Sequence, residues 1–183
     1  MRIISGSRRG HKLHEFEGED VRPTTDRVKE SIFNLIQNHV PDATVLDMFG
    51  GSGALAFEAL SRGAESAVVI DSDKRSVELI RKNMRDLKFE DVCDVRQLSC
   101  FDYAKTCDKK FDLIFLDPPY NKGFIEPALT AISENELLSE SGIVLLESDN
   151  TDFKNEFPGL LMEKQRRYGR TFVTIYKSAK DGE

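Results

Sequence analysis

The sequence predicts an α/β fold built on an open, mostly parallel β-sheet. Short apolar strands alternate with helical stretches along most of the chain, and the first of these strands leads directly into a glycine-rich turn. Alternation of this kind requires right-handed crossovers between parallel strands. The 183 residues, of which 39% are apolar, suffice for one such domain with a small appendage.

The amino-terminal residues predict two short strands, 2–5 and 12–16, around a turn that contains glycine and arginine. Pro23 and the threonines after it signal the start of a helix, whose apolar residues recur at helical spacing as far as Ile36. Strands are then expected at 44–48, 66–70, 92–98, 111–116 and 142–147, and helices at 54–62, 74–87, 101–106 and 124–133. Two last strands, 160–168 and 171–177, meet at Gly169 in an antiparallel hairpin. We therefore divide the chain into an extension, residues 1–20, and a main domain, residues 21–178.

The segment Asp117-Pro118-Pro119-Tyr120 follows an apolar strand and is the strongest functional signal in the chain. Open α/β sheets bind their ligands at the carboxyl ends of such strands. The two prolines remove two N–H donors, so the segment offers carbonyl groups and a carboxylate that can accept hydrogen bonds from an exocyclic amino group. Tyr120 adds a flat face on which a base can stack. Alternatively, the segment is a proline turn that ends a strand and exposes a tyrosine.

A second motif, residues 45–53, joins a strand to a helix through Gly50, Gly51 and Gly53. Glycines allow the backbone to approach a ligand closely at a helix N-terminus. Asp47 at the strand end would repel a phosphate but not a cation, which favours S-adenosylmethionine, because this cofactor carries a sulfonium and an ammonium and no phosphate. Asp71 ends the next strand, where doubly wound folds place a carboxylate on ribose hydroxyls. Asp71 could also simply cap the following helix, although Asp73 is better placed for that.

Composition limits the class of protein. The net charge is −6, yet residues 1–13 and 164–170 contain only basic charges, which suits local binding of nucleic-acid phosphates or ordinary solvated surface. Cys93, Cys100 and Cys107 form no C-x-x-C pair, and the three histidines are scattered, so neither a disulfide framework nor a metal centre is expected. No stretch has the length and hydrophobicity of a membrane span, and we expect a cytoplasmic location.

These motifs together resemble the bacterial 16S ribosomal RNA guanine-N2 methyltransferase family. The matching segments, residues 2–6, 9–13, 22–34, 47–53, 117–120 and 168–171, occur in order along nearly the whole chain, and 22–34 is the most specific of them. Two positions depart from the family pattern: Ser5 replaces a glycine, and Ser99-Cys100 stands where an acid often follows the third strand. The resemblance implies a Rossmann-like class I methyltransferase fold with a seven-stranded, mostly parallel sheet, a C-terminal antiparallel hairpin and a small N-terminal β-hairpin.

The resemblance also implies a set of site residues, with S-adenosylmethionine as cofactor and no metal. Catalysis is assigned to Asp117, Pro118, Pro119 and Tyr120. Cofactor binding is assigned to Thr24, Asp26, Phe33, Asp47, Met48, Phe49, Gly50, Gly51, Ser52, Gly53, Asp71, Ser72, Ser99 and Cys100, although Phe33 could equally be a core residue. RNA binding is assigned to Arg2, Arg8, Arg9, Lys12, Arg22, Arg27, Arg167 and Arg170. The expected partner is 16S ribosomal RNA, in an assembled or assembling small ribosomal subunit, and a monomer is expected.

Three alternative functions remain. The Asp-Pro-Pro-Tyr segment serves adenine as well as guanine, so an adenine-N6 methyltransferase acting on DNA or RNA has the same signature at this site. A protein glutamine methyltransferase typically carries asparagine at the first position of this segment, so Asp117 argues against it. A non-catalytic RNA-binding or assembly protein is the third alternative, and the intact glycine, acidic and proline motifs argue against that reading.

Overall fold

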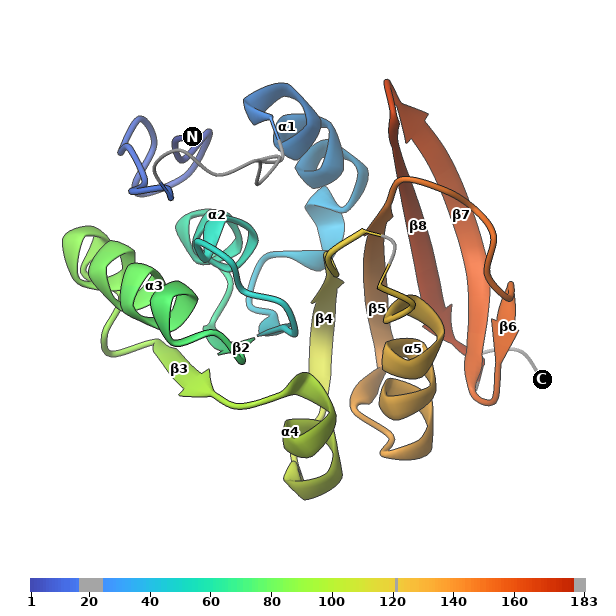
Figure 1. Cartoon of the computed structure of the whole chain (residues 1–183). Helices are drawn as coiled ribbons and strands as arrows, with labels where there is room; N and C mark the ends of the chain where they lie inside the picture. The colour runs from blue at the N-terminus through green and yellow to red at the C-terminus, as the bar shows by residue number, and fades with distance from the viewer. Residues whose placement is uncertain (17–24, 121, 180–183) are drawn as a thin grey trace.

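The computed structural model describes residues 1–16, 25–120 and 122–179. Its centre is an eight-stranded sheet in the order β3-β2-β1-β4-β5-β8-β7-β6 (Figure 1). Five strands run parallel: β1 (Thr44–Asp47), β2 (Ser66–Asp71), β3 (Cys93–Gln97), β4 (Phe111–Leu116) and β5 (Leu138–Ser148). Three form an antiparallel end: β6 (Glu156–Phe157), β7 (Leu160–Tyr168) and β8 (Thr171–Ser178). The predicted Rossmann-like class I fold is confirmed.

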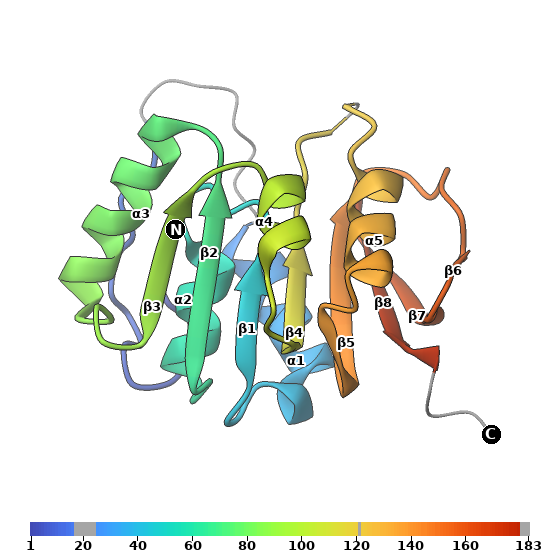
Figure 2. The ribbon, with the colours of Figure 1, turned by 90° about the horizontal axis from the view of Figure 1, so that it is seen from below.

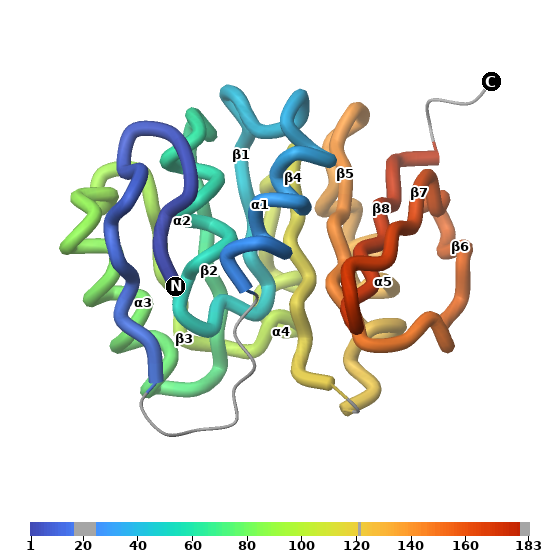
Figure 3. The backbone as a smooth tube through the Cα atoms, turned by 90° about the horizontal axis from the view of Figure 1, so that it is seen from above, coloured from blue at the N-terminus to red at the C-terminus, as the bar shows by residue number. Residues whose placement is uncertain are grey.

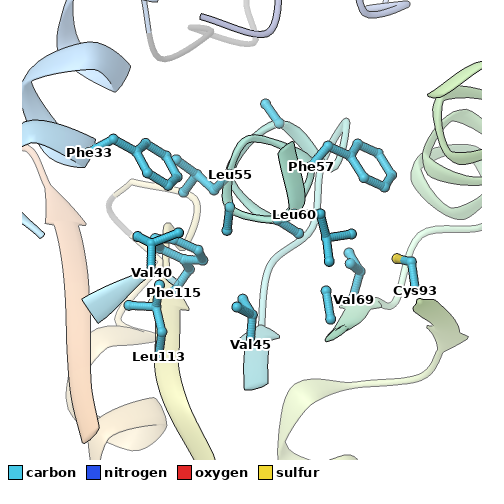
Figure 4. Close-up of a cluster of buried hydrophobic side chains, with 14 of the residues drawn as sticks. Phe33, Val40, Val45, Leu55, Phe57, Leu60, Val69, Cys93, Leu113 and Phe115 are labelled. Carbon is cyan, nitrogen blue, oxygen red and sulfur yellow. The ribbon is translucent and has the colours of Figure 1, made fainter. Parts of the chain in front are cut away.

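Helices cover both faces of the sheet. One face carries α1 (Asp26–Leu35), α2 (Ala54–Ser61) and α3 (Lys74–Leu87), and the other carries α4 (Cys100–Thr106) and α5 (Ile125–Glu134) (Figure 2). A single turn of 3₁₀ helix, Gln37–His39, links α1 to β1. On the first face, Leu60 of α2 lies above Val69 of the sheet (Figure 4), and Phe57 of α2 stacks on Phe89 at a centroid distance of 6.2 Å. The site is thereby built on parallel strands that are buried on both sides, which fixes the positions of their ends.

The strands differ from the expected ones at β6, at the amino terminus and at β5, which begins at Leu138 and not at residue 142. The sheet gains β6, whose two residues are too few to produce a periodic pattern in the sequence. The amino-terminal hairpin is reduced to one antiparallel bridge between Arg2 and Lys12. Backbone hydrogen bonds still join its two arms, from Ile3 N to the His11 carbonyl and from Leu13 N to the Met1 carbonyl. The N–H groups of Ile4 and Ser5 donate to the Glu58 carboxylate of α2 at 2.8 and 3.0 Å.

The amino-terminal segment, residues 1–16, lies across α2 and α3 (Figure 3). The side chains of Ile3 and Leu13 belong to the same buried cluster as α2. Glu58 is fully buried and also binds Lys29 Nζ at 3.2 Å and Arg62 Nε at 2.7 Å. A buried carboxylate with this many partners joins the segment to both α1 and α2, so the segment is part of the packed domain.

None of the helices in the described parts of the chain is long and apolar enough to cross a membrane.

Candidate active site

A cavity of about 1030 Å³ opens at the carboxyl ends of the parallel strands β1, β2 and β4. This is the edge of an open α/β sheet at which ligands bind. From the predicted set, the cavity wall contains Asp47, Met48, Phe49, Gly50, Gly51, Ser52, Asp71, Ser72, Ser99, Cys100, Asp117, Pro118, Pro119 and Tyr120. Residues from three separate motifs of the sequence therefore meet in one cavity.

The glycine loop, residues 50–53, depends on its glycines for two physical reasons. Gly51 and Gly53 have φ angles of 58° and 81°, in the left-handed region that glycine adopts without strain. A Cβ on Gly50 would lie 2.5 Å from the Val69 side chain, and one on Gly53 would lie 2.3 Å from the Phe57 ring. The loop therefore packs directly on β2 and α2, and its backbone forms a wall of the cavity.

Asp71 holds this loop in place. Its carboxylate accepts hydrogen bonds from the N–H of Gly51 at 2.9 Å and from the N–H of Asp73 at 2.9 Å. Burial raises the pKa of Asp71, and the two N–H donors oppose that rise. Asp73 accepts from Arg75 N at 2.7 Å and caps α3, as expected, while the ribose role of Asp71 stays a prediction.

The cavity is acidic. Asp47 is 1% exposed, and burial raises its pKa to about 7, although Phe49 N donates to it at 3.3 Å. Desolvation raises the pKa of Asp117 well above its ordinary value, and the nearby carboxyl groups of Glu147 and Asp47 raise it further. The described lining residues include no Lys, Arg or His side chain. Such a site favours a cation or a hydrogen-bond donor over a phosphate.

Several lining residues escaped the sequence analysis. Phe124 lies beside Phe49 and Phe101, with ring centroids 6.0 and 6.1 Å away, and all three rings line the cavity. Glu15 and Phe16 bring the amino-terminal segment to the same wall. A phenylalanine at helical spacing is indistinguishable from a core residue in the sequence, and nothing in residues 14–16 signals contact with a loop that lies far away in the chain.

Asn83 on α3 joins the amino-terminal segment to the glycine loop. Its Nδ2 donates to the carbonyl oxygens of Ser52 at 2.9 Å and His14 at 3.1 Å, and its Oδ1 accepts from His14 N at 2.8 Å. The side chain is 1% exposed and uses all of its polar atoms in these bonds. The buried Asn83 amide thus helps to hold Glu15 and Phe16 at the cavity, together with the ion pair between the Met1 N-terminus and Glu15 and the packing of Arg75 on the Phe16 ring.

Three predicted cofactor residues lie outside the cavity. Phe33 is fully buried against Phe115, with ring centroids 5.8 Å apart, so it is a core residue and the predicted cofactor contact is corrected. Asp26 pairs with Arg2 at 3.3 Å, and the described lining residues do not include it or Gly53. Thr24 lies outside the described residues.

Ser99 and Cys100 line the cavity with limited side-chain chemistry. The Ser99 hydroxyl accepts from Asp102 N at 3.0 Å and donates to the Asp102 carboxylate at 2.9 Å, so it caps α4. Burial raises the pKa of the Cys100 thiol to about 11 and keeps it neutral. In this part of the cavity a ligand would contact the Ser99 hydroxyl, which already caps α4, and the neutral Cys100 thiol. Neither residue offers it a carboxylate.

The predicted RNA-binding residues fall into two groups. Arg9, Lys12, Arg27 and Arg170 are exposed. Arg2 and Arg167 are exposed as well, but these two and Arg8 contact neighbours: Arg2 contacts Asp26, Arg8 the Leu87 carbonyl at 2.6 Å and the Phe89 ring, and Arg167 the Gly169 carbonyl at 2.9 Å and the Phe172 ring. Arg22 lies outside the described residues.

Comparisons with known proteins show the family and the fold of the chain. A family model described as "Conserved hypothetical protein 95" matches residues 1–177. The chain is 39% identical over 181 residues to "Putative rRNA methyltransferase YlbH" of Bacillus subtilis, covering 97% of this chain and 98% of that protein. It is 31% identical over 187 residues to "Ribosomal RNA small subunit methyltransferase D" of Escherichia coli K12, covering 100% and 92%. The solved structure "Putative methyltransferase yhhF from Escherichia coli" superposes with a TM-score of 0.87 at 31% identity, covering 97% of each chain.

Proposed function

The chain belongs to the family described as "Conserved hypothetical protein 95", and we propose that it methylates the exocyclic N2 amine of a guanine in 16S ribosomal RNA with S-adenosylmethionine as cofactor. The observation that carries the proposal is the convergence of the glycine loop, Asp71 and residues 117–120 on one acidic cavity. Relatives named "Ribosomal RNA small subunit methyltransferase D" support an RNA substrate in the small ribosomal subunit.

The chemistry of the cavity wall fits this cofactor. S-adenosylmethionine supplies an electrophilic methyl group on a positively charged sulfur. Asp47 and the backbone of residues 50–52 suit the methionine portion, because carboxylate and carbonyl groups attract its ammonium group and no phosphate has to be accommodated. Asp71 is our candidate for the ribose hydroxyls. Ser99 and Cys100 would border the adenine ring.

Residues 117–120 orient the amine. The N2 lone pair of guanine is delocalised into the ring, which makes the nitrogen a poor nucleophile. If the Asp117 carboxylate and the Pro118 carbonyl accept its two hydrogens, the nitrogen can become pyramidal and direct its lone pair at the methyl group. The rate then comes from alignment and electrostatics, without a covalent enzyme intermediate.

Tyr120 provides the surface that holds the target base. It lines the cavity next to Asp117, and an amine in a base-paired helix cannot reach the cofactor, so the guanine has to leave its stack. Stacking on the Tyr120 ring would compensate part of the cost of unstacking.

The exposed basic residues support RNA binding outside the cavity. Arg9 and Lys12 lie on the amino-terminal segment, and Arg170 lies at the β7–β8 turn. Phosphate contacts at these places would hold the RNA strand outside the acidic cavity, so that only the target base enters it. We propose that residues 1–20, whose described part packs on α2 and α3, serve as an RNA-contacting extension of the methyltransferase domain, residues 21–178, and that the protein acts as a monomer on an assembled or assembling subunit.

The test is to incubate the protein with methyl-labelled S-adenosylmethionine and small subunits from a strain that lacks the enzyme. Digestion to nucleosides and mass spectrometry should identify N2-methylguanosine as the labelled product. N6-methyladenosine would support the adenine alternative. The absence of labelled nucleoside from an enzyme that binds both ligands would support a non-catalytic role.

A further inference from the structure

β7 carries a run of basic residues along the edge of the sheet. It pairs with β8 along its length but with β6 only at Leu160 and Leu161. In the described sheet, residues 162–168 therefore have β8 on one side and no strand on the other. Charges on an edge strand can simply prevent its pairing with other chains. The division of these charges between the two faces of the sheet shows whether they can do more.

The register of β7 with β8 assigns two of the basic side chains to the α1 side of the sheet. Lys164 lies opposite Ile175, and Arg166 lies opposite Val173. Ile175 and Val173 belong to the buried cluster that also contains the core residues of α1 and α2. Residues directly opposite each other in an antiparallel pair share a face, so Lys164 and Arg166 are on this side of β7.

Arg167 lies on the opposite face of β7. Its register partner is Phe172, and its guanidinium carbon lies 5.4 Å from the centroid of that ring. The segment between β5 and β7 packs on the same face through Phe153, which contacts the cluster under α4 and α5. This segment carries the exposed acids Asp152 and Glu156. Acidic groups near this face oppose the approach of a polyanion.

The α1 side of β7 is both accessible and basic. Figure 3 shows this side, and none of the described helices lies over β7 there. Lys164 and Arg166 are exposed, and within the described parts of the chain neither forms an ion pair with a carboxylate. Arg166 Nη1 donates to the neighbouring Gln165 carbonyl at 3.1 Å. The acid beside them in the sequence, Glu163, already pairs with Lys177 at 4.0 Å. Both cations are therefore available to an anionic partner.

This basic side of β7 leads to the edge of the sheet at which the cavity opens. β8 begins beside the end of β5, because Phe172 is in register with Ser148. The β7–β8 turn, which contains the exposed Arg170, therefore lies at the carboxyl edge of the parallel strands. From Tyr168 at this turn to Lys164 the strand spans about 14 Å, at about 3.4 Å per residue. That length offers room for several successive phosphates of one strand.

We propose that Lys164, Arg166 and Arg170 form a basic track on the α1 side of β7 that binds the sugar–phosphate backbone of the RNA beside the target base. The inference rests on the proposed function and deepens it, because it specifies the path of the RNA substrate. It adds Lys164 and Arg166 to the RNA-binding residues and leaves Arg167 outside the track. Phosphate contacts position a nucleic acid without reading its sequence, so the track would align the strand while the cavity selects the base.

The test is a pair of single substitutions at adjacent residues. Arg166→Gln and Arg167→Gln each remove one exposed positive charge from the same strand, but from opposite faces. Filter binding with labelled 16S ribosomal RNA measures the affinity over a range of salt concentrations. We expect Arg166→Gln to weaken binding several-fold and to reduce the slope of log K against log salt by about 0.7–0.9, the value of one lost phosphate contact. Arg167→Gln should match wild type, and adding Lys164→Gln to Arg166→Gln should double the loss of slope.

Two results would refute the inference. Equal effects of Arg166→Gln and Arg167→Gln would overturn the assignment to one face, and no effect of either would show that the basic run only shields the sheet edge. Circular dichroism and calorimetry with S-adenosylmethionine should give wild-type values for both variants, because neither residue is among the described residues of the cavity wall. Wild-type protein that shows the expected binding pattern but transfers no labelled methyl group would refute the proposed methylation and leave the track in place. Wild-type protein without affinity for the RNA would refute both.

Discussion

The Asp47→Asn change should stabilise the ligand-free protein against unfolding at alkaline pH and weaken its binding of S-adenosylmethionine. Asp47 is 1% exposed at the end of β1, and burial raises its pKa from 3.8 to about 7. Asparagine keeps an oxygen that can accept the hydrogen bond from Phe49 N. The substitution therefore removes a buried charge and leaves the local backbone bond in place.

The size of this stabilisation follows from the pKa of Asp47. The folded state binds a proton at Asp47 more tightly than the unfolded state, so the free energy of unfolding falls as pH rises from about 4 through the folded pKa of about 7. Each pKa unit is worth about 1.36 kcal/mol, so the full loss is about 4 kcal/mol. The gain of the Asp47→Asn variant should be small at pH 4, grow up to pH 7, and stay constant above it.

Urea unfolding at pH 4.5, 6, 7 and 8 measures this gain. Asp108→Asn is the matched control, because Asp108 is exposed and the change in net charge is the same. We expect the Asp47→Asn variant to exceed the control by several kcal/mol at pH 8 and to bind S-adenosylmethionine more weakly. A gain in the free energy of unfolding that is independent of pH, or no larger than that of the control, would show that the buried Asp47 carboxylate does not destabilise the ligand-free protein.

Three further predictions concern other parts of the molecule. Glu58→Ala should lower the free energy of unfolding by about 3–5 kcal/mol, because it leaves the buried Lys29 ammonium without its carboxylate; a loss below about 1 kcal/mol in urea would contradict this. Asp71→Ala should weaken S-adenosylmethionine binding by about 1–3 kcal/mol in calorimetry, and an unchanged affinity in a folded variant would remove Asp71 from the site. Arg9→Glu should raise the KM for RNA and flatten its salt dependence, and values equal to wild type would make Arg9 ordinary solvated surface.

The parallel part of the fold could be predicted because its signals are local. All the parallel strands but β3 contain a short apolar run. The glycines of the loop are required by the backbone angles of Gly51 and Gly53 and by the close approach of Gly50 to Val69. The family resemblance is confirmed by the match over residues 1–177. The cavity residues that end strands were found for the same reason, since a strand end is visible in the sequence.

The remaining parts depend on contacts between distant segments. The amino-terminal hairpin is attached to α2 by Glu58, which accepts hydrogen bonds from Ile4 N and Ser5 N more than fifty residues away, and no local pattern reveals this contact. Phe33 was ambiguous because a helical apolar position fits either the core or a ligand, and only its contact with Phe115 decides. In the sequence Glu147 is only the last residue of an expected strand. The register of β4 and β5 then places it beside Asp117.

Single-turnover methylation by an Asp117→Ala variant tests the central claim most directly. The substitution removes the carboxylate that we propose orients the amine and leaves β4 and both prolines in place. The rate with saturating RNA and cofactor should fall steeply while the affinity for S-adenosylmethionine changes little, because the interaction strengthens as the nitrogen becomes pyramidal. A variant that methylates guanine at the wild-type rate would contradict the role of Asp117, and with it the mechanism proposed for this cavity.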